Sequence, residues 1–96
     1  MIKPMKTFLI SYDLGVPETH SDYTVLFNHL KSLYSSWARP VKSVWIIKSD
    51  KDAGQIRDEI KTVLDLNDKL IVIEMSGNWG TYNISKEVTD WMKNNI

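Results

Sequence analysis

The chain has 96 residues, no cysteine, and 12 acidic and 12 basic side chains, so its formal net charge is zero. This length allows one domain with one core, and the lack of cysteine excludes disulfides, thiolate nucleophiles and zinc-thiolate sites. Hydrophobic residues make up 43% and charged residues 25% of the chain, values close to the average for globular proteins that exclude disordered and fibrous classes.

The first predicted element is a strand over residues 7–13 with apolar side chains on both faces, typical of a central strand. It ends at Asp13, in the sequence Tyr-Asp-Leu-Gly. Burying a charge is costly unless it is paired or bound to a metal, so this carboxylate lies at a solvated edge or has a function. Two interpretations stay open: Asp13 binds a divalent metal, or it accepts hydrogen bonds from the amides of the following turn.

A helix is predicted to start near Ser21 or Asp22, because apolar side chains then recur at the spacing of one helix face. Two short strands follow at residues 37–39 and 43–48, with a turn between them, since Pro40 cannot donate to a sheet ladder. A second helix begins after Asp52, which can form a variant capping box with the residue three positions later. Its buried face is predicted to contain Ile56, Ile60, Val63 and Leu64.

The last strand is predicted at residues 69–77, again apolar on both faces, and Ser85 is placed to cap a closing helix. Strand, helix, strand, strand, helix, strand is the order of a ferredoxin-like α+β sandwich with an antiparallel sheet, here with an added C-terminal helix. We expect one domain over residues 1–96, with a core at about 6–76 and an extension at 77–96. The first and last strands, the most apolar, are expected at the centre of the sheet.

Two helices cover only one face of such a sheet, and leaving several apolar side chains of the other face in water forfeits about 1.5 to 3 kcal/mol each. The C-terminal helix or a second copy of the chain must therefore cover that face, and we expect a homodimer. The side chains expected at a dimer or partner contact are those of the last loop and helix: Trp79, Tyr82, Trp91 and Met92.

Clustered positive charge is sparse. Residues 1–48 contain six Lys and Arg against three Asp and Glu, and only Arg39, Lys42 and Lys48 are clustered. They lie on the predicted hairpin beside Trp37 and Trp45, and basic residues interleaved with aromatics are typical of single-stranded nucleic-acid binding. Packing in the core is the favoured interpretation of the two tryptophans.

Three segments together resemble one family: FLISYDLG in the first strand, PVKSVWIIKS in the middle and LDLNDKLIVIEMSG before and in the last strand. They are similar to the second CRISPR-associated (Cas-two) family. GNW and the terminal VTDWMKNNI resemble its small SinR-like relatives. One departure is that LGVPETHSD, after the aspartate, has acids and a histidine where the family often has basic residues.

The resemblance implies a ferredoxin-like homodimer in which Asp13, near its dimer mate, holds Mg²⁺ or Mn²⁺ and takes part in metal-dependent cleavage of RNA or DNA. The alternative is a non-catalytic adaptor dimer that binds nucleic acid or protein, with Asp13 structural. No apolar run approaches the roughly 18 residues of a membrane span, and no leader cleavage site is evident, so we expect a cytoplasmic protein without a membrane partner.

Overall fold

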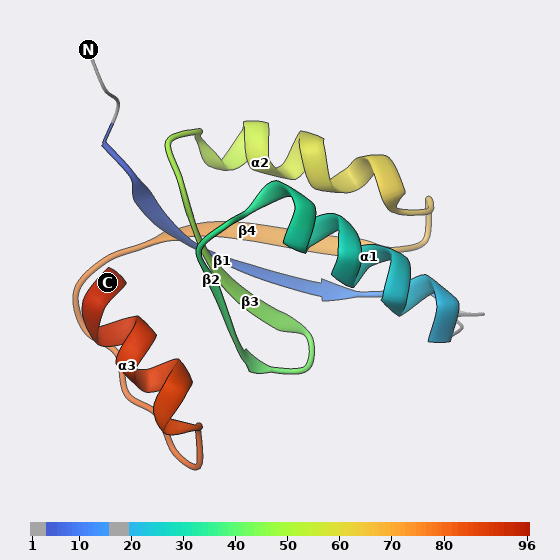
Figure 1. Ribbon diagram of the computed structural model, residues 1–96. Helices are drawn as coiled ribbons and strands as arrows, with labels where there is room; N and C mark the ends of the chain where they lie inside the picture. The colour runs from blue at the N-terminus through green and yellow to red at the C-terminus, as the bar shows by residue number, and fades with distance from the viewer. Residues whose placement is uncertain (1–3, 16–19) are drawn as a thin grey trace.

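The computed structural model describes residues 4–15 and 20–96 (Figure 1). The strands are β1 (Lys6–Asp13), β2 (Trp37–Val41), β3 (Val44–Ser49) and β4 (Lys69–Met75). The helices are α1 (His20–Leu33), α2 (Ala53–Ile60), the short 3₁₀ helix η1 (Lys61–Val63) and α3 (Lys86–Asn95). This order confirms the predicted ferredoxin-like α+β fold with an added C-terminal helix.

The four strands form one antiparallel sheet in the order β2-β3-β1-β4. The central strands are therefore β1 and β3, and the prediction that the last strand is central was wrong, because β4 is an edge strand. Apolar side chains on both faces of β4 show that both faces need to be covered. They do not show whether the strand has one or two hydrogen-bonded neighbours in the sheet. The apolar outer face of β4 thus needs a cover from outside the sheet.

The hydrophobic core lies between the sheet and the two helices α1 and α2, which cover the same face (Figure 1). Its fully buried side chains come from β1, β3, α1 and α2: Phe8, Ile10, Trp45, Ile47, Leu26, Leu30, Ile56 and Ile60. Trp45 has no exposed surface, which confirms the packing interpretation for this tryptophan. Its ring centroid lies 4.5 Å from that of Trp37 and 5.2 Å from that of Phe27.

The β2–β3 hairpin is tied to β1 by the buried Tyr12 hydroxyl. This hydroxyl accepts a hydrogen bond from Trp45 Nε1 and donates one to the carbonyl of Lys42, both at 3.2 Å. The turn lies at residues 42–43, so Pro40 belongs to β2 and not to the turn as predicted. Because β2 is an edge strand, a residue without an amide hydrogen is tolerated there.

The helix starts follow local sequence signals. Asp52 caps α2 and forms the predicted capping box with Gln55, and the Ser85 hydroxyl caps α3 as predicted. Helix α2 has eight residues and is too short to be stable alone, so its stability comes from the packing of Ile56 and Ile60. Within residues 4–15 and 20–96, no helix is long and apolar enough to cross a membrane.

Helix α3 packs on the opposite face of the sheet from α1 and α2, over β2 and the adjoining end of β1. Met92 and Ile46 are buried between them. The carbonyl of Asn95 accepts hydrogen bonds from Thr7 Oγ1 at 2.6 Å and from Lys48 Nζ at 3.2 Å. This helix therefore covers β2, β3 and the start of β1 on that face, and the rest of β1 stays open together with β4.

Candidate functional site

Asp13 is the last residue of β1, and its side chain is exposed. Side chains alternate along a strand, so Asp13 points to the open face with Leu9 and Ser11, away from the core that contains Tyr12. Its cross-strand neighbour is Lys69 on β4, but no ion pair forms between them. In the part of the chain that the structure describes, the Asp13 carboxylate has no hydrogen-bond or ion-pair partner.

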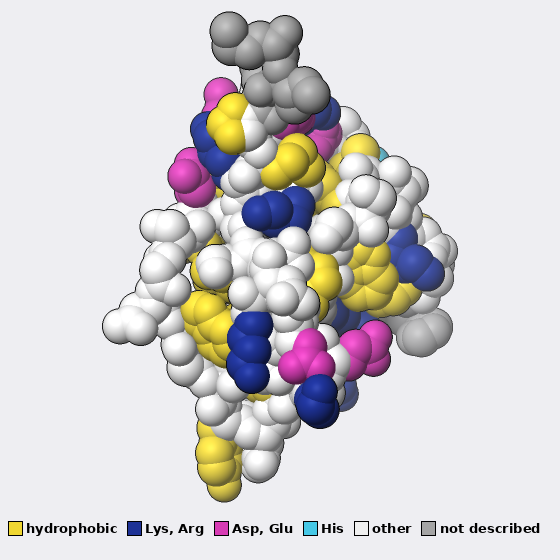
Figure 2. All heavy atoms as spheres, turned by 60° about the vertical axis from the view of Figure 1, so that its left-hand side comes forward, with side chains coloured by type: hydrophobic (Ala, Val, Ile, Leu, Met, Phe, Trp, Pro, Cys, Tyr) yellow, Lys and Arg dark blue, Asp and Glu magenta, His cyan; other side chains and the backbone are white. Residues whose placement is uncertain are grey.

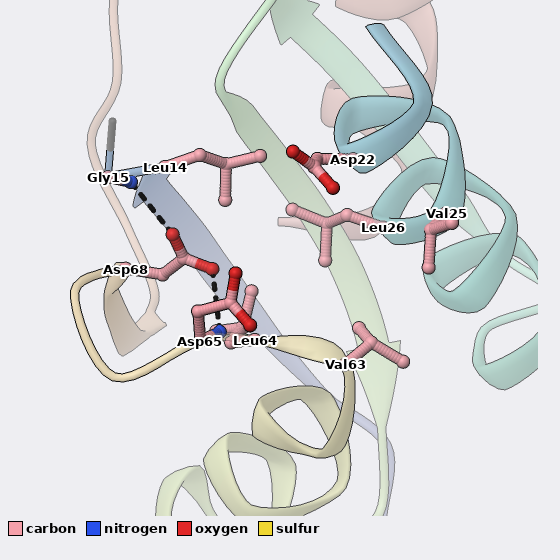
Figure 3. Close-up of a pocket in the computed structure, with 9 residues that line it drawn as sticks. All are labelled: Leu14, Gly15, Asp22, Val25, Leu26, Val63, Leu64, Asp65 and Asp68. Atoms are coloured by element: carbon pink, nitrogen blue, oxygen red, sulfur yellow. Dashed lines mark hydrogen bonds between the residues drawn. The ribbon is translucent and has the colours of Figure 1, made fainter. Parts of the chain in front are cut away.

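The amide of the turn after Asp13 is bound by a different carboxylate. Gly15 N–H donates to Asp68 Oδ1 at 2.7 Å, and Asp65 N–H donates to Asp68 Oδ2 at 2.8 Å (Figure 3). Asp68 thus ties the end of β1 to the turn before β4, and sequence reasoning missed it. Because Gly15 N–H goes to Asp68, the interpretation of Asp13 as the acceptor for this amide is not supported.

Asp68 also lines a hollow between α1 and the segment before β4 (Figure 3). Asp22 and Asp65 reach the same hollow from opposite sides, and the remaining walls are largely apolar. The two oxygens of Asp68 already accept backbone hydrogen bonds, so this carboxylate has a structural role. Among the described residues, no three histidine or carboxylate side chains are grouped closely enough to hold a metal.

The open part of the sheet lies beside Asp13. Ile71 is 52% exposed and Ile73 is 49% exposed, and both point to the same face as their neighbours on β1, which are Ser11 for Ile71 and Leu9 for Ile73. Ser11, Asp13, Lys69 and Ile71 also line a shallow depression at this end of the two strands. One chain thus offers a single carboxylate at the end of a partly exposed and mostly apolar strip, which we call the open face: Leu9, Ser11, Ile71 and Ile73.

Of the three basic residues singled out in the sequence, Arg39 and Lys42 are in contact, and Lys48 lies apart from them. Lys48 lies under α3, where its ammonium donates to Thr7 Oγ1 and to the carbonyl of Asn95. Arg39 lies on the α1 side of β2, with its guanidinium 5.2 Å from the centroid of Phe27. Lys42 is exposed in the hairpin turn. On the side of the molecule in Figure 2, Lys and Arg side chains are likewise spread between separate apolar groups.

The four side chains expected at a partner contact differ in exposure. Tyr82 is 85% exposed, and Trp79 is half-buried. Trp91 is half-buried, and its indole N–H donates to Ser36 Oγ at 3.2 Å. Met92 is packed inside the chain with 4% of its surface exposed, so the structure does not offer it to a partner.

No protein-family model matches the chain. Its fold is similar to that in the crystal structure of a hypothetical protein, TT1823, from Thermus thermophilus, with a TM-score of 0.63. The two sequences are 22% identical, and the match covers 84% of this chain and 94% of the other. At this identity the likeness supports the fold and carries no information on activity.

Proposed function

We propose that the chain forms a homodimer that cleaves RNA or DNA with Mg²⁺ or Mn²⁺ held by Asp13 of both subunits. The observation that carries this proposal is the position of Asp13. Its carboxylate is exposed, has no partner in the described part of the chain, and ends the same face on which Ile71 and Ile73 are about half exposed. The resemblance to the Cas-two family supports it as well, because Asp13 matches the aspartate at the end of strand one to which metal-dependent nuclease activity is assigned in that family.

The donor chemistry fits a hard divalent cation, because Mg²⁺ and Mn²⁺ prefer carboxylate oxygens. One exposed carboxylate is a weak ligand by itself, so the site is incomplete in a single chain. Two carboxylates held together without a cation repel each other, and one tends to take up a proton. A divalent cation bound there would polarise a water molecule for attack and neutralise charge on the phosphate.

A second copy of the chain is the cover that suits the open face. Burying Ile71 and Ile73 against the same side chains of a partner removes apolar surface from water at about 25 cal/mol per Å². Asp13 lies on this face two residues from Ser11. A twofold axis that passes near the end of β1 would therefore place the two Asp13 side chains next to each other.

The test is cleavage of end-labelled RNA, single-stranded DNA and duplex DNA by the wild type and by Asp13→Asn, each with Mg²⁺, with Mn²⁺ and with EDTA. We expect metal-dependent cleavage by the wild type and a loss of at least about 100-fold in Asp13→Asn, since the amide is a poorer ligand. Equal cleavage by both proteins, or none by either, would contradict the nuclease proposal.

A second candidate is a non-catalytic adaptor dimer that binds nucleic acid or protein. It is favoured by the lack of a three-residue metal cluster in residues 4–15 and 20–96, because the metal site then depends wholly on the dimer. Dimerisation through the open face is common to both candidates. The two candidates predict different results for Asp13→Asn. This substitution would abolish the activity of a nuclease but would leave the binding of an adaptor intact.

A further inference from the structure

One cationic and aromatic cluster lies on the surface between α1 and β2. Lys31 Nζ and the guanidinium carbon of Arg39 each lie 5.2 Å from the centroid of the Phe27 ring. Tyr23, Phe27 and Lys31 are spaced four residues apart on α1, so they follow one stripe of the helix surface. We call Tyr23, Phe27, Lys31 and Arg39, with Lys42 beside them, the α1–β2 patch.

The patch is held in place from below. Phe27 packs edge-on against the buried Trp45, and its ring also contacts Trp37. The Arg39 guanidinium donates to the carbonyl of Lys42 from Nε at 3.0 Å and from Nη2 at 2.8 Å. A guanidinium has five N–H donors, so three of them remain for a ligand in a fixed orientation. This preorganisation lowers the entropy lost on binding.

The charge of this surface differs from that of its surroundings. Tyr23, Thr24, Phe27 and Arg39 line a shallow hollow to which, among the described residues, no carboxylate contributes. Four other surface hollows of the described chain each contain at least one Asp or Glu side chain, and Arg39 also lines one of these, together with Glu87. In a chain with no net charge, the α1–β2 patch is therefore a local group of positive charges.

We infer that the α1–β2 patch binds single-stranded nucleic acid. Phosphates would pair with Arg39, Lys31 and Lys42, since a guanidinium fork matches the oxygens of a phosphate. Bases would stack on Tyr23, which is 39% exposed, and on the outer plane of the Arg39 guanidinium. Its aromatic surface suits unstacked bases, which a duplex does not offer. This inference rests on the proposed function for its ligand class, but it concerns binding and not cleavage.

Lys48 is not part of this surface. It lies on the opposite face of the sheet and donates to the carbonyl of Asn95. Lys31, which the sequence did not single out, takes its place because it reaches the Phe27 ring from the last turn of α1. With two or three phosphates contacted, the logarithm of the affinity should fall with the logarithm of salt concentration with a slope of about −1.4 to −2.

The experiment is fluorescence anisotropy of a labelled single-stranded oligonucleotide in EDTA at two salt concentrations, so that no cleavage intervenes. The variants are Lys31→Gln and the double variant Lys31→Gln with Arg39→Gln. The matched control is the double variant Arg57→Gln with Lys61→Gln, whose positions lie on α2 and η1. Both control side chains are exposed and pair only with Asp58 in the described chain. The double variant removes two phosphate contacts without a change in chain length.

We expect the double variant to bind at least about tenfold more weakly, Lys31→Gln to show a smaller loss, and the control to stay within about twofold of the wild type. A duplex of the same sequence should bind more weakly than the single strand. Because the assay contains EDTA, its result does not depend on metal-dependent cleavage, which separates this inference from the nuclease proposal. Equal binding by the double variant and the control, or no binding by the wild type at low salt, would overturn the inference.

Discussion

The ammonium of Lys48 lies 3.2 Å from the backbone carbonyl of Asn95, in the last turn of α3. A cation at this end of a helix interacts favourably with the helix dipole. The same ammonium also donates to Thr7 Oγ1 at 3.1 Å, which joins β1, β3 and α3 at one point. Lys48 thus anchors the C-terminal helix to the sheet.

Replacement of this lysine by an apolar residue of similar length should therefore loosen α3. We expect Lys48→Met to lower the free energy of unfolding by about 1 kcal/mol, which corresponds to about 4 to 8 °C in Tm for a domain of this size. Thermal unfolding followed by circular dichroism measures the change. Lys93→Met, at an exposed position of α3, is the control, and equal melting of the two variants would show that the contact is not stabilising.

Tyr12→Phe should be more damaging than the loss of one hydroxyl suggests. Trp45 has no exposed surface, and its indole N–H donates to the Tyr12 hydroxyl. Without this acceptor a buried donor is left unsatisfied, at a cost of about 1 to 3 kcal/mol. Urea unfolding of Tyr12→Phe and of the exposed control Tyr82→Phe measures the difference, and two variants of equal stability would refute this explanation.

Stability should fall in alkaline solution through Tyr34. Burial, together with the hydrogen bond to Glu59 Oε1 at 2.6 Å and the charge of that carboxylate, raises the pKa of Tyr34 far above its usual range. The folded chain then keeps the phenolic proton while the unfolded chain loses it above the ordinary tyrosine pKa of about 10. Unfolding therefore releases a proton above that pH, and the free energy of unfolding decreases as pH rises.

Unfolding free energies of the wild type and Tyr34→Phe between pH 8 and about 11 test this linkage. We expect the wild type to lose stability more steeply than the variant above pH of about 10. Below that pH the difference between the two proteins should be constant. Parallel curves over the whole range would mean that Tyr34 does not titrate differently in the folded and unfolded chains.

The open face can be tested separately from the chemistry. Ile71→Lys with Ile73→Lys places two charges on it, and because both side chains are about half exposed in the single chain, the fold should tolerate them. We expect the dissociation constant of the dimer to rise at least about 100-fold in sedimentation, against little change for Val25→Lys, whose side chain is 50% exposed on α1. A double variant that dimerises as the wild type does would exclude the open face as the interface.

Local signals in the sequence were sufficient for much of the fold. The capping box of Asp52 and Gln55 spans four residues, and the alternating strand of β1 can be read directly. The order of the elements then selects the ferredoxin-like arrangement. The position of each strand within the sheet was harder to predict, because β4 has the composition of a central strand but lies at the edge. Its composition instead reflects a face that α3 does not reach.

The site could be predicted only in part, because its contacts join distant segments. Asp68 accepts the amide of Gly15 from 53 positions along the chain, and Lys48 donates to the carbonyl of Asn95 from 47 positions away. No short sequence motif indicates either of these two contacts. The exposed position of Asp13 at a strand end could be inferred, since a carboxylate after an apolar strand is costly to bury.

The measurement that tests the central claim most directly is cross-linking of Asp13→Cys with a short thiol-to-thiol reagent. The natural chain has no cysteine, so the new thiol is the only one. If Asp13 meets its mate across the twofold axis, the variant should form a covalent dimer in high yield, and Asp58→Cys, exposed on α2, should not. A chain that is dimeric in sedimentation but is not cross-linked through position 13 would contradict the shared metal site.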